Sequence, residues 1–94
     1  MKIKALFKGI MQDWVGAAEA EFDLKKGATY SDLLREIHRR FGRNFAQGLW
    51  DPRRKAFAES VAALLQDNAR KLDDLKTELK DGQCINFFLL ALGG

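Results

Sequence analysis

The apolar residues of this chain change their spacing after residue 24, and this change limits the folds that the chain can adopt. Within the run from residue 3 to residue 10, Ile3, Ala5 and Phe7 fall on one parity, whereas Lys2, Lys4 and Lys8 fall on the other. Residues 18–24, AEAEFDL, alternate in the same way between apolar and acidic side chains. Such alternation is typical of a β-strand with one buried face. The two segments therefore predict a β-hairpin, with residues 12–17 as its connection.

From residue 29 the apolar side chains recur at every third or fourth position, which is typical of a helix with one buried face. Thr29 followed by Asp32 resembles a capping box, in which the side chains of the first and fourth residues bond each other's backbone N–H groups. Gly42 is suited to end such a helix. The predicted buried stripe comprises Tyr30, Leu33, Leu34, Ile37 and Phe41.

The middle of the chain is less regular. Residues 44–57, NFAQGLWDPRRKAF, contain a glycine and a proline and are predicted mostly as a loop, with Phe45, Leu49 and Trp50 on the core. Residues 57–72 are rich in helix-forming side chains, and propensity alone favours a helix there. The segment VAALL within them also fits a short buried strand, so the residues alone leave both interpretations open.

The last part of the chain has a clearer pattern. Residues 80–83, KDGQ, are a turn signal, and residues 84–92, CINFFLLAL, are predicted as a buried strand. The order of elements is then two strands, a helix and further strands. This order predicts an α+β domain in which a sheet packs on one helix.

The composition is that of one small globular domain: 94 residues, of which 47% are hydrophobic and 31% charged. The longest apolar run has six residues, far fewer than the roughly 20 that span a bilayer. A single cysteine, Cys84, rules out an internal disulfide and favours a reducing compartment, so we expect a cytoplasmic protein. The net charge of +3 does not favour a nucleic-acid-binding surface.

Residue types that often form catalytic or metal sites lack partners at the required spacing. Cys84 lies in the predicted last strand with no histidine near it in sequence, which is typical of an inert buried thiol. His38 lies within the predicted helix without a second metal ligand nearby, so no metal site is expected. Trp14 and Trp50 are predicted to cover the edge of the core, with a role as interface anchors as the alternative.

The chain ends in INFFLLALGG, an apolar run followed by two glycines. Because glycine has no Cβ, Gly93 and Gly94 can pass through a narrow channel and carry the terminal carboxylate of Gly94 to another protein's active site. ATP can activate a carboxylate by forming an acyl-adenylate, so the chain would be a co-substrate and not an enzyme. The apolar residues expected to dock against the partner are Phe87, Phe88, Leu89, Leu90 and Leu92.

Three segments together, GATYSDLL, LKDGQ and INFFLLALGG, resemble the MoaD/ThiS sulfur-carrier family, whose usual ending is similar to D-G-D-x-V-x-F-F-P-P-x-x-G-G. The resemblance covers residues 1–42 and about 72–94. Two leucines replace the prolines of the pattern, and QDNARK at residues 66–71 lacks the usual Asn-Gly turn. The long loop at residues 43–60 makes the chain closer to MoaD than to ThiS. The residues that match the ending are Asp81, Gly82, Ile85, Phe87, Phe88, Gly93 and Gly94.

The resemblance implies a ubiquitin-like β-grasp fold, with a mixed sheet of four to five strands packed on one main helix. Residues 1–94 would form a single domain with a flexible Gly-Gly tail. The family topology also places a strand at about residues 61–65 and a short helical turn near residues 73–76.

The resemblance further implies a reaction cycle. A ubiquitin-activating-type adenylyltransferase, MoeB-like or ThiF-like, would use ATP and Mg²⁺ to adenylate Gly94, and a persulfide donor would convert it to a thiocarboxylate. The chain itself would bind no cofactor. A MoaD-like chain would be the small subunit of a molybdopterin synthase, with a MoaE-like large subunit, in molybdenum or tungsten cofactor biosynthesis. A ThiS-like chain would deliver sulfur to a thiazole synthase for thiamine.

Two other classes of function stay open at this point. A ubiquitin-like modifier, conjugated to lysines of target proteins, needs the same adenylation of Gly94. A non-reactive binding module would end in two glycines by chance.

Overall fold

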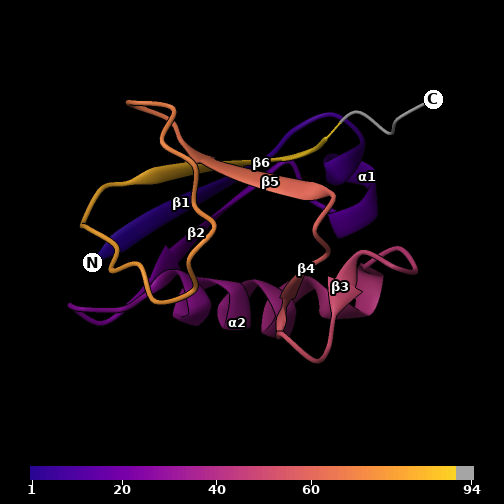
Figure 1. Ribbon diagram of the computed structural model, residues 1–94, viewed down its shortest axis with the longest axis horizontal. Helices are drawn as coiled ribbons and strands as arrows, with labels where there is room; N and C mark the ends of the chain where they lie inside the picture. Colours follow the sequence, from indigo (N-terminus) through magenta and orange to yellow (C-terminus); the bar gives the residue numbers. More distant parts are fainter. Residues whose placement is uncertain (91–94) are drawn as a thin grey trace.

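A four-stranded sheet and one long helix form the two layers of the structure (Figure 1). The computed structural model describes residues 1–90. The helix α2 (Tyr30–Phe41) crosses one face of the sheet. The strand order is β2-β1-β6-β5, which comprises β2 (Glu19–Asp23), β1 (Lys2–Phe7), β6 (Cys84–Leu89) and β5 (Val61–Leu65). The α+β class and the mixed sheet packed on one main helix are therefore confirmed.

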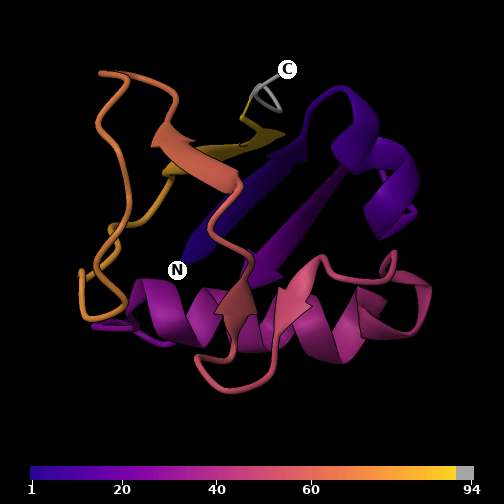
Figure 2. The same ribbon diagram turned by 45° about the vertical axis from the view of Figure 1, so that its right-hand side comes forward.

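The two central strands, β1 and β6, run parallel, whereas both outer pairings are antiparallel. In the parallel pair, Lys4 lies opposite Cys84 and Phe7 lies opposite Phe87. The end of β6 therefore lies beside the end of β1, at the far end of the sheet from Met1 (Figure 2). This pairing brings together the two segments, residues 1–42 and about 72–94, that resemble the sulfur-carrier family.

The predicted β-hairpin forms, with Ile3 opposite Phe22, but its first strand is shorter than expected. The strand predicted for residues 3–10 ends at Phe7, and the helix α1 (Ile10–Val15) follows within the connection. Gly9 has a φ of 57°, a left-handed conformation that few other residues adopt, and it turns the chain out of the sheet. The helix then buries Met11 and Val15, which lie one helical turn apart.

The start of α2 is a reciprocal capping box, as predicted. The Thr29 N–H donates to Asp32 Oδ2 at 2.8 Å, and the Asp32 N–H donates to Thr29 Oγ1 at 3.3 Å. Four members of the predicted stripe are buried, and Phe41 is half-buried. Gly42 follows the helix with a right-handed φ of −55°, so the chain continues into a 3-10 turn, η1 (Gly42–Asn44).

The predicted loop at residues 44–57 contains a small antiparallel hairpin that the sequence pattern did not indicate. Its strands are β3 (Trp50–Asp51) and β4 (Ala56–Phe57). Leu49 is buried, and Phe45 and Trp50 pack against the core, as expected. The strands have two residues each, which is too short for an alternating pattern to be visible.

The ambiguous segment is a strand over residues 61–65, so the helix favoured by propensity is wrong. β5 pairs with β6 along its whole length, and tertiary pairing overrides the preference of alanine and leucine for helix. The helical turn expected near residues 73–76 is also wrong. The chain forms a single hydrogen-bonded turn there, with the Thr77 N–H donating to the Asp74 carbonyl at 3.0 Å.

The core lies between the sheet and α2 and is apolar, with no buried polar or charged residue among residues 1–90. Phe87 is at its centre. Its ring stacks on Phe7 with centroids 5.6 Å apart and on Tyr30 at 6.3 Å, and it meets Phe57 edge-on at 5.4 Å. The last strand is therefore the element that joins the sheet, α2 and the small hairpin.

Candidate functional site

The side of the sheet that faces away from α2, called the outer face below, carries the second set of side chains from β6. Because successive residues of a strand point to opposite faces, Ile85 and Phe87 enter the core while Cys84, Asn86 and Phe88 lie on the outer face. Beyond the strand, the Leu90 N–H donates to the Ser60 carbonyl at 2.7 Å. The β5–β6 ladder therefore continues to Leu90.

Neighbouring strands extend this outer face with further apolar side chains. Leu6 of β1 and Leu64 of β5 both lie opposite Asn86. Leu6, Leu64 and Phe88 are half-buried, and Leu90 is 44% exposed. We call these four residues, Leu6, Leu64, Phe88 and Leu90, the outer patch. Because a contiguous apolar surface often takes part in binding, the outer patch is a candidate interaction site.

Asn86 lies in the middle of the outer patch and has an unusual environment. Its Oδ1 atom is shielded from solvent and has no hydrogen-bond partner among the described residues. Buried polar atoms almost always have such a partner, so this oxygen is an exception within the structure.

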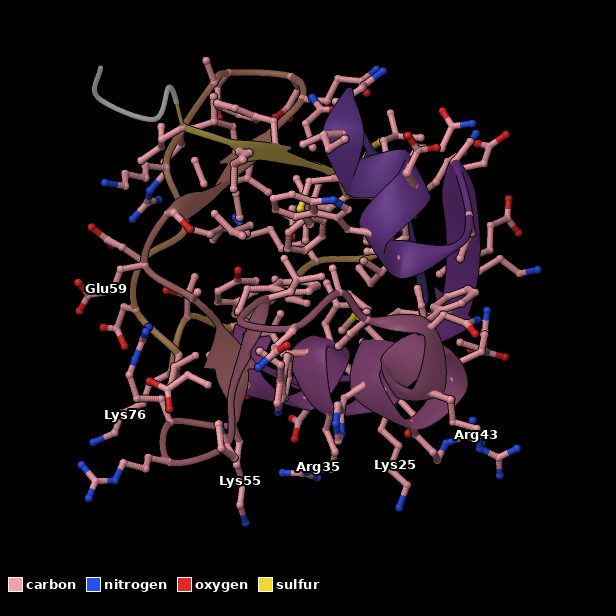
Figure 3. All side chains as sticks on the ribbon, turned by 90° about the vertical axis from the view of Figure 1, so that its right-hand side faces the viewer. Lys25, Arg35, Arg43, Lys55, Glu59 and Lys76 are labelled. Atoms are coloured by element: carbon pink, nitrogen blue, oxygen red, sulfur yellow. The ribbon has the colours of Figure 1, made fainter. Side chains whose placement is uncertain are left out.

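Charged side chains border the outer patch on β1 and β2. Lys4 Nζ contacts Glu19 Oε2 at 2.8 Å, and this hydrogen bond raises the pKa of Lys4 above its usual value. Lys8 follows β1 and is exposed. The basic side chains Lys25, Arg35 and Lys55 instead lie on the α2 side, away from the outer face (Figure 3). The outer patch thus consists of apolar side chains around Asn86 and has charged side chains along one border.

Cys84 lies on the outer face next to the outer patch and is partly exposed, not fully buried as expected. Its Sγ–H donates to Gln66 Oε1 at 3.1 Å. Burial of the thiol raises the pKa of Cys84, and the nearby Lys4 and Lys8 only partly offset this effect. A raised pKa leaves the group as a thiol at neutral pH, which is the opposite of what a nucleophile needs.

The predicted partner-binding residues do not all lie on one surface of the structure. Phe88 and Leu90 belong to the outer patch, and Leu89 is half-buried. Phe87 is fully buried, so its assignment to the partner-binding set is wrong: its ring fills the core and cannot contact a partner. Leu92, Gly93 and Gly94 lie outside the described residues.

Sequence reasoning missed three residues of this surface, which are Leu6, Leu64 and Asn86. Leu6 carried a usable signal, because it shares the parity of the lysines in the first strand. An apolar residue on the wet parity of a strand indicates an exposed apolar position. Leu64 had no such signal, since its segment was ambiguous between helix and strand.

The histidine and the two tryptophans considered as candidate site residues pack against other side chains in the structure. His38 is exposed and stacks on Trp50, with ring centroids 4.5 Å apart and an interplanar angle of 8°. Trp14 and Trp50 pack against the core as partly buried residues. The described residues contain no cluster of three histidine, cysteine or carboxylate side chains placed to hold a metal ion. Within residues 1–90, no helix has both the length and the apolar character needed to cross a bilayer.

The structure is similar to several solved structures. Small archaeal modifier protein 1 from Haloferax volcanii matches with a TM-score of 0.80 at 14% identity, covering 100% of both chains. A candidate molybdopterin converting factor, subunit 1, from Pyrococcus furiosus matches with a TM-score of 0.69 at 28% identity, covering 96% of this chain and 98% of its own.

A third similar structure is a protein–protein complex of subunits 1 and 2 of the molybdopterin-converting factor from Helicobacter pylori. Its matching chain has a TM-score of 0.59 at 22% identity, with 100% of both chains covered. No protein-family model and no curated protein matches the chain. The three structures confirm the ubiquitin-like β-grasp fold. The Pyrococcus furiosus structure, at 28% identity, also supports the resemblance to the MoaD/ThiS family of sulfur carriers.

Proposed function

We propose that this chain is a sulfur carrier protein in which the carboxylate of Gly94 is adenylated and converted to a thiocarboxylate. The observation that carries the proposal is the outer patch, whose residues Phe88 and Leu90 are followed closely in sequence by Gly93 and Gly94. Gly94 follows Leu90 by four residues. A partner that covers the outer patch is therefore within reach of the final glycine.

The chemistry uses the chain as a co-substrate. An adenylating enzyme with ATP and Mg²⁺ forms an acyl-adenylate on Gly94 and releases pyrophosphate. The terminal sulfur of a persulfide donor then attacks the acyl carbon, and AMP leaves. Reductive cleavage of the resulting disulfide by a thiol releases the thiocarboxylate. Because the activation consumes ATP, we also propose that the protein acts in the cytoplasm.

We further propose that the sulfur enters molybdopterin, with this chain as the small subunit of a synthase and a MoaE-like protein as its large subunit. The support is the Pyrococcus furiosus neighbour, which has the highest identity among the three similar structures described above. The Helicobacter pylori complex gives a structural parallel for a two-subunit assembly. A ThiS-like role with a thiazole synthase is the alternative acceptor.

A second candidate function is a ubiquitin-like modifier conjugated to lysines of target proteins. It is favoured by the similarity to small archaeal modifier protein 1, which covers the whole of both chains. Both functions need the same adenylation at Gly94. Conjugates of higher mass that contain this chain, detected in cell extracts with an antibody, would support the modifier.

The first experiment is intact-protein mass spectrometry of the full chain after incubation with ATP, Mg²⁺, a persulfide donor and the adenylating enzyme from the same genome. The expected result is a mass gain equal to the replacement of one oxygen by sulfur, located on Gly94 by fragmentation. The same spectrum of the untreated protein checks that the mature chain ends at Gly94, which the proposal requires.

A control variant carries one additional residue after Gly94. A carrier or modifier loses its activation by this change, because the reacting carboxylate is displaced. An unmodified wild-type protein, in the presence of an enzyme shown to be active, would leave the non-reactive binding module as the function.

A further inference from the structure

Asn86 is the one residue among those described whose side chain has a buried polar atom without a hydrogen-bond partner. It lies on β6, a central strand of the sheet, and points to the outer face. Its place coincides with the middle of the outer patch. Two independent features, an apolar surface and an unpaired acceptor, therefore meet at one position.

The surroundings of Asn86 explain why its oxygen is unpaired. Across the sheet it lies between Leu6 and Leu64, neither of which has a side-chain donor. Along β6 its outer-face neighbours are Cys84 and Phe88, and the Cys84 thiol already donates to Gln66. In the free protein no neighbouring side chain on this face supplies the missing hydrogen bond.

An asparagine at this position works against the stability of the free protein. Asparagine is depleted in strands, and a buried amide oxygen without a donor loses its bonds to water without replacement. An apolar side chain would suit the strand and the outer patch better. Folding alone therefore does not explain why this position holds an asparagine.

We propose that Asn86 is a specificity-determining residue of the outer patch, and that its amide oxygen accepts a hydrogen bond from an N–H or O–H group of the adenylating enzyme. This inference rests on the function proposed above. Rotation about the Cβ–Cγ bond turns the oxygen outward without moving the backbone. A partner with a donor gains a hydrogen bond to this oxygen, whereas an apolar surface leaves it unpaired as in the free protein, so the partner with the donor binds more tightly.

We choose the adenylating enzyme as the partner because the outer patch and Gly94 lie close together along the chain. The outer patch ends at Leu90, and Gly94 follows four residues later, so the protein that receives Gly94 also lies against the outer patch. Both the sulfur carrier and the modifier need the adenylating enzyme. A synthase subunit, in contrast, is needed only by the carrier.

The test variant is Asn86→Leu, which removes the amide and keeps a side chain of similar size. We expect its Tm to rise by about 4–8 °C, because an unpaired buried acceptor is removed. We expect its Kd for the adenylating enzyme to weaken about tenfold, because the enzyme's donor is left unpaired in the complex. Thermal denaturation and isothermal titration calorimetry of the full chain measure these two quantities.

The matched control is Asn44→Leu, the same substitution at an exposed residue of η1 outside the outer patch. Its Kd should stay within about twofold of the wild-type value. If Asn86→Leu raises the Tm and leaves the Kd unchanged or tighter, the proposal is overturned, and Asn86 is a tolerated defect. A lowered Tm overturns it as well, since the amide is then satisfied in the free protein.

The wild-type titration separates this inference from the proposed function. Wild-type binding and thiocarboxylate formation together with an unchanged Kd for Asn86→Leu overturn the role of Asn86 alone. A wild-type chain that neither binds nor is activated by the enzyme overturns both proposals. As a direct readout, the side-chain amide resonances of Asn86 should shift on addition of the enzyme in an NMR titration.

Discussion

Phe87 and Phe88 are adjacent in β6 and lie on opposite faces of the sheet. Phe87 is fully buried and stacks on Phe7 and Tyr30 in the core. Phe88 is half-buried and lies opposite Ala62 of β5 on the outer face. The register of one strand therefore assigns one phenylalanine to folding and the next to the outer patch.

The first prediction follows from this difference. Phe88→Asp places a charge within the outer patch, so binding to the adenylating enzyme should weaken at least about tenfold. The charge remains close to water, so the loss of stability should be about 1 kcal/mol. Calorimetric titration and urea denaturation measure the two effects.

Phe87→Ala is the matched comparison at the neighbouring position. It leaves a cavity among three aromatic rings and should lower the free energy of unfolding by about 3–5 kcal/mol. If Phe88→Asp were as destabilising as Phe87→Ala, Phe88 would be a core residue and would not belong to the outer patch.

The second prediction concerns the final residue. Gly94→Ala should leave the Tm unchanged and slow thiocarboxylate formation about a hundredfold, because a methyl group displaces the reacting carboxylate in a narrow channel. Time courses of intact mass with the adenylating enzyme measure the rate. Undiminished thiocarboxylate formation by this variant would contradict the idea that bare glycines are needed for threading.

A third prediction concerns the pH dependence of the Cys84 thiol. Burial raises its pKa, so less thiolate is present at neutral pH than in a free cysteine, and alkylation by iodoacetamide should be slower at pH 7. As the pH rises, the rate should increase, with a midpoint above that of a free thiol. In urea the midpoint should return to the ordinary value, because the burial is lost.

Gln66→Ala tests the hydrogen bond within this prediction. The Gln66 oxygen accepts from the neutral thiol and so stabilises the protonated form. Its removal should lower the alkylation midpoint in the folded protein. A midpoint equal to or below that of a free thiol in the wild-type protein would show that Cys84 is activated.

The fourth prediction concerns the turn after β5. Ala69 has a φ of 55°, a left-handed conformation that is strained for a residue with a Cβ. Ala69→Gly should relieve this strain and raise the free energy of unfolding by about 0.5 kcal/mol, after the larger chain entropy of glycine is subtracted. Urea denaturation measures the change.

The control for this turn is Ala18→Gly, at an exposed residue whose φ is not positive. There the substitution only adds freedom to the unfolded chain and should destabilise by about 0.5–1 kcal/mol. Equal losses at both positions would mean that Ala69 is not strained in solution.

Several elements were predictable because their signals lie within a few neighbouring residues. The stripe and capping box of α2 occur within residues 29–41, and both are present in the structure. The alternating segments before it pair as a hairpin, and the KDGQ turn precedes β6. A helix period, a cap and a strand period are local properties of the chain, so one sequence is enough to recognise them.

The short helix α1, the β3–β4 hairpin and the strand at residues 61–65 were not decided by local signals. Residues 61–65 prefer helix by composition, and only pairing with β6 holds them as a strand. The resemblance to the sulfur-carrier family placed this strand correctly, while the helical turn it placed near residues 73–76 is absent. Tertiary contacts outweighed local preference in these segments.

The sequence by itself determined the α+β class and the main helix, because the period of each element and the cap of the helix are read from neighbouring residues. It is also the source of the chemistry proposed for Gly94. Only the tertiary structure decided that Phe87 is fully buried and cannot contact a partner, and that Leu6 and Leu64 flank Asn86 on the outer face. Strands far apart in sequence become neighbours only when the sheet forms, and their register then decides which side chains share a surface.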